Sequence, residues 1–149
     1  MAIYYAKGPY DIRHTVPSSA FSKGDLLVLT SNSSISRAAT STNSLGAIAN
    51  GTIAGVAMAS SLDSIANLVP WLVAYPATVY WSDATSGSQM TPGEKLDFEY
   101  TGATFRVTTS AITPIAMIDP NGASQDVVGQ STTSRVKIML DPTFLLFRS

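Results

Sequence analysis

The sequence predicts an all-β fold, a single-domain β-barrel or β-sandwich of short antiparallel strands with an extended N-terminal arm and at most one short helix. Three observations support this prediction. Short apolar and aromatic runs recur at spacings of roughly 8 to 12 residues, turn residues separate them, and helical spacing occurs in one stretch only. At 149 residues the chain has the length of one domain.

The N-terminal segment, residues 1–16, mixes apolar and aromatic side chains without a regular pattern. It is too apolar for a disordered tail, so we expect an extended arm that lies on its own domain or on a neighbour. Residues 17–149 then form the barrel or sandwich. Within them, residues 22–25 indicate a turn, and the apolar run 26–30 predicts a buried strand.

The middle of the chain carries a hairpin signal and the one helical pattern. Asn50-Gly51 predicts a turn between strands at 45–49 and 52–58, because a type I′ turn needs positive φ at both central positions. Gly55 inside the second strand, like Gly46 in the first, indicates close approach of another backbone. Residues 61–68 have helical spacing and predict two helical turns at most, ended by Pro70.

Both tryptophans and two of the six tyrosines fall within residues 69–81. Proline fixes φ and lacks a backbone donor, so Pro70 and Pro76 predict two short strands, 71–75 and 78–81, separated by a kink. Large aromatic side chains stabilise a small domain when they are buried. We therefore expect Trp71 and residues 75–81 at the centre of the barrel.

The second half of the chain alternates between apolar and polar residues. Residues 96–100 and 105–108, separated by a turn at 101–103, predict a hairpin with one apolar face. A strand at 112–118 is expected at an edge or a bulge because it contains Pro114. A late strand at 135–140 precedes a very apolar tail at 144–147.

The composition excludes several classes of partner. Charged residues make up 13% of the chain and the formal net charge is −1, whereas soluble domains contain roughly 25% charged residues. A protein so poor in charge is expected either to hide much of its surface against partners or to rely on its many serines and threonines for solvation. Lysines and arginines are scattered singly, so no nucleic-acid partner is expected. The first ten residues lack a signal-peptide pattern and no run reaches a membrane span, so we expect a soluble cytosolic product with no membrane partner.

No motif of an enzyme, metal site or cofactor site occurs in the sequence. The chain has no cysteine and a single histidine, His14, which cannot alone supply the ligands of a zinc site. Asp97 and Glu99 share one face of a strand and could form an acid/base pair or bind calcium. We expect them instead to be the solvated side of that strand. The predicted function is therefore not enzymatic.

An ordered set of motifs resembles the small β-rich cement or decoration proteins on the outside of tailed-bacteriophage heads. The set comprises Ser22-Lys23-Gly24-Asp25 before the buried strand, residues 52–57, residues 75–81, residues 93–97 and the closing strand 134–140. The resemblance covers most of the chain. It implies a structural virion protein, made in the host cytoplasm, that binds assembled major capsid protein as a homotrimer and stabilises the head by bridging neighbouring capsid subunits.

The apolar ends of the chain are the expected contacts with that partner, since buried apolar area contributes roughly 25 cal/mol per Å². The predicted partner-binding residues are Tyr4, Tyr5, Tyr10, Ile12 and Arg13 of the arm and Phe144 and Phe147 of the tail. The other interpretation is that both ends only cover their own barrel.

Two further functions stay open at this point. One is a carbohydrate- or receptor-binding β module of a phage tail or fibre, in which Trp71, Tyr75, Tyr80 and Trp81 would form an exposed stacking platform. The other is a small hydrolase that uses Asp97, Glu99 or His14.

Overall fold

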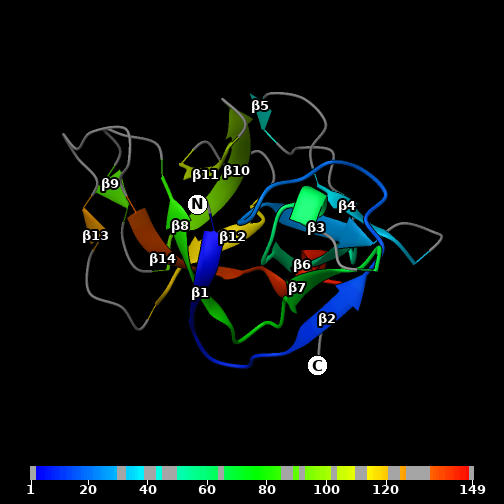
Figure 1. Ribbon diagram of the computed structural model, residues 1–149. Coiled ribbons are helices and arrows are strands. Elements are labelled where there is room, and N and C mark those ends of the chain that lie inside the picture. Colours follow the sequence, from blue (N-terminus) through cyan, green and yellow to red (C-terminus); the bar gives the residue numbers. More distant parts are fainter. Residues whose placement is uncertain are drawn as a thin grey trace.

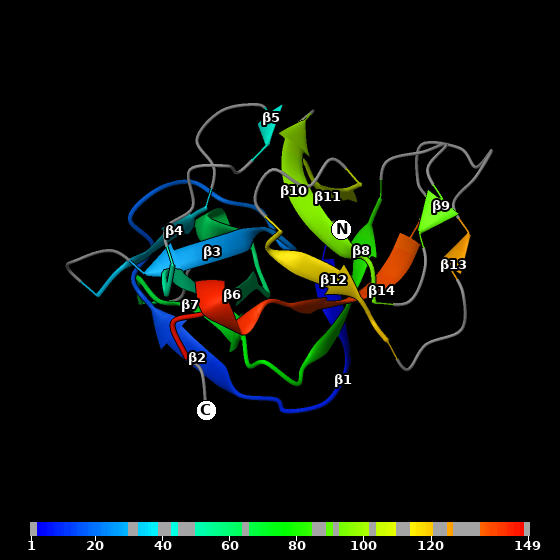
Figure 2. The same cartoon turned by 180° about the vertical axis from the view of Figure 1, so that it is seen from behind.

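The computed structural model describes residues 3–29, 33–38, 43–44, 50–63, 66–84, 89–90, 93–101, 104–109, 114–120, 125–126 and 135–147. They form two antiparallel sheets that lie against each other (Figures 1 and 2), which confirms the all-β prediction. Among the described residues, no helix has the length and apolar character needed to cross a bilayer.

The larger sheet joins distant parts of the chain in the order β1-β8-β14-β12-β10-β11, and β5 also pairs with β10. β10 and β11 form the predicted hairpin, in which Phe98 lies opposite Val107. The bounds of these strands are β1 Ile3–Lys7, β5 Asn43–Ser44, β8 Val79–Asp83, β10 Lys95–Thr101, β11 Thr104–Thr108, β12 Ala116–Ile118 and β14 Arg135–Leu140.

The smaller sheet has the order β2-β7-β6-β3-β4, and all its neighbours are antiparallel. A separate ladder pairs β9 with β13. The bounds are β2 Ile12–Thr15, β3 Leu26–Leu29, β4 Ile35–Arg37, β6 Ile53–Ala57, β7 Val69–Val73, β9 Gln89–Met90 and β13 Gln125–Asp126.

Both sheets curl, and a short contact reaches across the curve of each. In the smaller sheet, the Ile35 N–H donates to the Val16 carbonyl (2.9 Å) and the Ser18 N–H to the Ile35 carbonyl (2.8 Å). These bonds join the segment after β2 to β4. In the larger sheet a parallel bridge joins Ala84, directly after β8, to Val107 of β11. The fold is thus a sandwich whose two sheets are each strongly curved, as sheets of twisted strands become before they close.

Two apolar cores follow from the alternation of side chains along the strands. The main core lies between the sheets and contains, for example, Leu72 of β7 and Tyr80 of β8. The second core lies on the other face of the smaller sheet and includes Trp71 and Val73, the neighbours of Leu72. Trp71 and Tyr80 are fully buried, as expected of a central aromatic stretch, whereas Trp81 is only half-buried.

Gly55 and Pro70 show how the smaller sheet accommodates residues that rarely suit central strands. A Cβ atom at Gly55 would lie 1.9 Å from the carbonyl oxygen of Leu72, so the predicted close approach of a backbone is present. Pro70 lies inside β7 rather than at its start. Its missing N–H is tolerated because it would donate toward Met58, which lies just past the end of β6; the Pro70 carbonyl still accepts a hydrogen bond from the Met58 N–H at 3.3 Å.

The helical pattern at 61–68 was misleading. The described part forms one 3-10 turn, Ser61–Asp63, in which the side chain of Leu62 is 89% exposed. Ala66 and Asn67 have positive φ angles of 53° and 63°, which end any right-handed helix. The expected apolar helix face therefore does not form. The predicted strand at 45–49 and Gly46 lie outside the described residues.

Within the segment expected as an arm, residues 1–16, the described residues 3–16 contribute a strand to each of the two sheets. β1 pairs with β8 and β2 pairs with β7, and each is the terminal strand of its sheet's hydrogen-bonded order. The intervening residues 8–11 cross from the larger sheet to the smaller one (Figure 1). This segment therefore lies on its own domain, where it builds the candidate surface described next.

Candidate interaction surface

The crossing of the N-terminal segment between the sheets leaves an apolar hollow beside it. The hollow has a volume of about 270 Å³. One wall is formed by side chains of the N-terminal segment and the other by side chains of β6 and β7. The hollow is lined by Ile3, Tyr4, Tyr5, Tyr10, Lys23, Val56, Ala57, Met58 and Leu72. Three of the predicted partner-binding residues thus come together in one place.

The tyrosines at this hollow are held in place while they remain exposed. The rings of Tyr5 and Tyr10 meet edge to face with centroids 4.9 Å apart, and the Tyr5 hydroxyl donates to the Gly8 carbonyl at 2.9 Å. Tyr10 is nevertheless 52% exposed. Rigid, exposed aromatic rings lose little conformational entropy on binding, which is why tyrosine is enriched at interfaces. Tyr4 lies under the guanidinium of Arg135.

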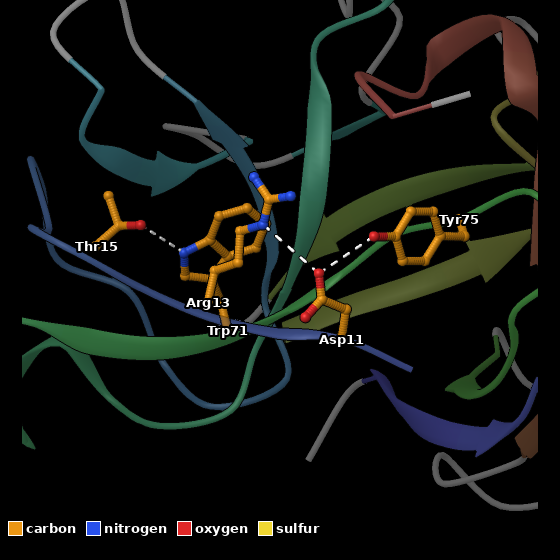
Figure 3. Close-up of polar contacts among 5 residues, drawn as sticks. All are labelled: Asp11, Arg13, Thr15, Trp71 and Tyr75. Carbon is orange, nitrogen blue, oxygen red and sulfur yellow. Dashed lines mark hydrogen bonds and ion pairs between the residues drawn. The ribbon is translucent and has the colours of Figure 1, made fainter. Parts of the chain in front are cut away.

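The opposite face of β2 carries a polar network (Figure 3). Asp11 accepts a hydrogen bond from the Tyr75 hydroxyl (3.2 Å) and forms an ion pair with Arg13 (3.7 Å). The indole N–H of Trp71 donates to the hydroxyl of Thr15 at 2.8 Å. Residues 11, 13 and 15 share this face because side chains alternate along a strand. Arg13, a predicted contact residue, is therefore partly engaged within its own chain.

The two predicted contacts in the tail have different positions. Phe147 is half-buried, and the centroid of its ring lies 6.4 Å from that of Trp71. The guanidinium carbon of Arg13 lies 4.6 Å from the centroid of the Phe147 ring. Phe144 is only 9% exposed and belongs to the main core. Phe144 stays a prediction as a partner contact, although its ring has little exposed area left to offer a partner.

His14 lies in a second hollow, of about 410 Å³, on the same face of β2 as Ile12. His14 pairs with Pro70, and Ile12 pairs with Leu72. The hollow is lined by His14, Ala59, Asp63, Leu68 and Pro70. Leu68 and Ile12 are among the exposed large apolar side chains. The wall of this second hollow thus combines apolar side chains with His14 and Asp63.

The expectation that Asp97 lies on a solvated face was wrong. Asp97 is fully buried, and its carboxylate accepts a hydrogen bond from the Phe98 N–H at 2.8 Å. The prediction assumed a sheet with one open face, whereas the larger sheet closes through the Ala84–Val107 bridge. Glu99 is half-buried and forms an ion pair with Arg106 at 3.6 Å. Both carboxylates thus have structural partners of their own.

Two other carboxyl groups are perturbed by their surroundings. Burial raises the pKa of Asp25, although the Ser22 N–H donates to it at 2.9 Å. Burial also raises the pKa of Asp83, against the opposing effect of Arg135 at 3.4 Å. They lie beside different sheets and form no joint site. Among the described residues, no group of three or more histidine, aspartate and glutamate side chains is placed to hold a metal ion.

The polar network of β2 was not foreseen from the sequence. Asp11 and Thr15 had no assigned role, and Trp71 and Tyr75 were considered only as core residues or as parts of a sugar platform. The available signal was the two-residue spacing of Asp11, Arg13 and Thr15, which places them on one face once a strand is recognised.

No known protein-family model matches this chain, and no curated protein matches its sequence significantly. The function must therefore be inferred from the surface itself.

Proposed function

We propose that this chain is a structural virion protein that binds the outside of a bacteriophage head and stabilises it by bridging neighbouring major capsid proteins. The observation that carries the proposal is the apolar hollow flanked by Tyr5 and Tyr10, which presents rigid aromatic rings to a partner. The ordered motifs shared with cement proteins support it, as does the low content of charged residues. The partner is the major capsid protein, and the proposed working form is a homotrimer without nucleic acid or membrane.

The proposal includes no catalytic activity. An enzyme needs ionisable groups gathered in a pocket. In the described residues, His14 lies beside the smaller sheet, whereas Asp97 and Glu99 lie on β10 of the larger sheet and are engaged there. This separation argues against a hydrolase that combines them.

Carbohydrate or receptor binding by a tail or fibre module is the second proposal. A stacking platform requires exposed aromatic faces. Trp71 and Tyr80 are buried, so the platform would depend on Tyr75 and Trp81 alone, and the ring of Trp81 already has the Lys137 ammonium 5.1 Å from its centroid. The burial of Trp71 and Tyr80 and the contact of Trp81 with Lys137 make the head-binding proposal the stronger one.

The test is co-sedimentation of the full chain with heads of the phage that encodes it, from which the chain has been removed. We expect Tyr10→Ala and Tyr5→Ala to weaken binding about tenfold or more, as interface aromatic residues do. Leu62→Ala is the matched control, because Leu62 is an exposed apolar residue that does not line the hollow. Absence of the chain from purified particles, or equal binding by all three variants, would refute the proposal.

Truncation of residues 1–16 is not a suitable variant, since it removes β1 and β2 and with them one strand of each sheet. Point substitutions of exposed tyrosines avoid this difficulty. Thermal unfolding of each variant shows whether a loss of head binding is independent of a loss of stability.

A further inference from the structure

We propose that two copies of this chain pair antiparallel through the free edge of β2, around a twofold axis at Ile12. This contact concerns the chain itself and goes beyond its proposed role on a phage head. It would join the smaller sheets of two copies into one continuous sheet.

The edge of β2 is available for such pairing. The Val73 N–H donates to the Asp11 carbonyl at 2.9 Å, so Asp11, Arg13 and Thr15 direct their backbone groups toward β7. The backbone groups of Ile12 and His14 alternate with these and point to the opposite edge. Within the described residues, no backbone partner is found for them on that edge. In both views of the molecule β2 lies at its outer margin (Figures 1 and 2).

The backbone pattern restricts how a second β2 can pair. A residue whose backbone N–H and C=O point to the free edge must lie opposite a residue of the other copy whose backbone groups also point to that edge. Ile12 therefore lies opposite either Ile12 or His14 of the other copy. Pairing Ile12 with Ile12 places Asp11 opposite Arg13 of the other copy, twice, by symmetry. Pairing Ile12 with His14 places Arg13 opposite Arg13, which is repulsive. Charge complementarity therefore selects the register centred on Ile12.

The side chains suit that register on both faces of the joined sheet. Asp11 and Arg13 lie on one face and are each about half-exposed, so they can reach across to the other copy. On the other face, Ile12 is 37% exposed and would meet its own copy. Pro9 and Pro17, which lack backbone donors, bound the segment and keep the pairing short.

A contact that uses only β2 leaves the other surfaces of the chain open. An isologous pair closes on itself and joins two copies. It is therefore compatible with a separate threefold contact, in which case it would link copies that belong to neighbouring trimers.

Charge exchange between positions 11 and 13 tests the contact. Asp11→Arg alone places two arginines opposite two arginines, and Arg13→Asp alone places two aspartates opposite two aspartates. We expect each variant to raise the dissociation constant of the pair about tenfold or more by sedimentation velocity. A mixture of the two variants faces arginine with aspartate at all four positions, so the mixture should associate again. Failure of the mixture to associate better than its components would overturn the proposal.

A disulfide test reads the register directly and does not depend on charge. Because the native chain has no cysteine, Ile12→Cys introduces the only thiol. Opposed residues of an antiparallel pair lie within the Cα distance of roughly 4.4–6.8 Å that a disulfide requires. Two Cys residues introduced by Tyr10→Cys would be offset by about 13 Å along the strands. Oxidation should cross-link Ile12→Cys into covalent dimers and leave Tyr10→Cys without a cross-link; cross-linking of neither variant, or of Tyr10→Cys alone, would refute the register.

Discussion

The carbonyl oxygen of Leu72 lies 1.9 Å from the position that a Cβ atom at Gly55 would occupy. β6 and β7 pair across this point, and Gly55 lies opposite Val73. No side chain larger than hydrogen fits between the two strands, so a single residue determines how closely β6 packs against β7.

We therefore expect Gly55→Ala to destabilise the fold by about 3 kcal/mol or more, because the obstructing atom is backbone and cannot move aside alone. Gly93→Ala is the matched control, since nothing lies within 4 Å of its added Cβ. Gly93 has a positive φ of 82°, which disfavours alanine, and we expect this strain to cost about 1 kcal/mol. Urea unfolding of both variants measures the difference, and equal losses would contradict the close approach.

The hydrogen bond between Trp71 and Thr15 gives a second prediction. Thr15→Val keeps the shape of the side chain but leaves the indole N–H without its acceptor, which costs about 1–3 kcal/mol for a buried donor. Thr15→Ser keeps the hydroxyl and should lose much less. The free energies of unfolding of the two variants decide the matter; a larger loss for serine than for valine would show that only the methyl group matters.

The two phenylalanines near the end of the chain should differ in their effect on stability. Phe144→Ala removes a ring from the main core and should cost about 3 kcal/mol or more. Phe147→Ala removes a half-buried ring and its contact with Arg13, for which about 1 kcal/mol is expected. Thermal unfolding ranks them. The reverse ranking would mean that the outer aromatic group, and not the main core, anchors this part of the chain.

Asp25 should make stability depend on pH. Burial raises its pKa in the folded state above the ordinary value of 3.8, so the folded chain holds this proton more tightly than the unfolded chain. The contribution of Asp25 to the free energy of unfolding therefore falls as the pH rises from 3.8 through the raised pKa. Asp25→Asn retains an acceptor for the Ser22 N–H and removes the titration. Unfolding measured at several pH values should show a flatter dependence for the variant in this window; parallel curves would exclude the effect.

Local patterns predicted the fold class and several strands because each depends on neighbouring residues. The alternation around Phe98 and Phe105 identified the hairpin β10–β11, and the apolar run at 26–30 identified β3. The same local logic failed at Asp97, whose burial depends on how the sheet closes, and at Leu62, whose spacing suggested a helix face. Closure of the sheet is set by residues far away in the sequence, whereas the helix pattern failed because Ala66 and Asn67 adopt positive φ angles.

The candidate surface was predicted in part. The exposed residues Tyr5, Tyr10 and Ile12 could be selected from their apolar character in an irregular segment. The sequence could not show that this segment divides into two edge strands of different sheets. Ile3 pairs with Ser82 and Ile12 pairs with Leu72, and both pairings join residues far apart in the chain. The burial of Phe144 could not be predicted for the same reason, because the sequence shows that a ring is apolar but not which surface it covers.

The place of β14 in the larger sheet has a consequence for synthesis. β14 lies between β8 and β12, so the strand that leaves the ribosome last among those described is inserted into the middle of the sheet. Until then β8 and β12 each lack one neighbour, and only the bridge from Ala84 to Val107 joins the two parts of the sheet. Because closing such distant contacts is slow, the nascent chain carries unpaired strand edges until residues 135–140 emerge.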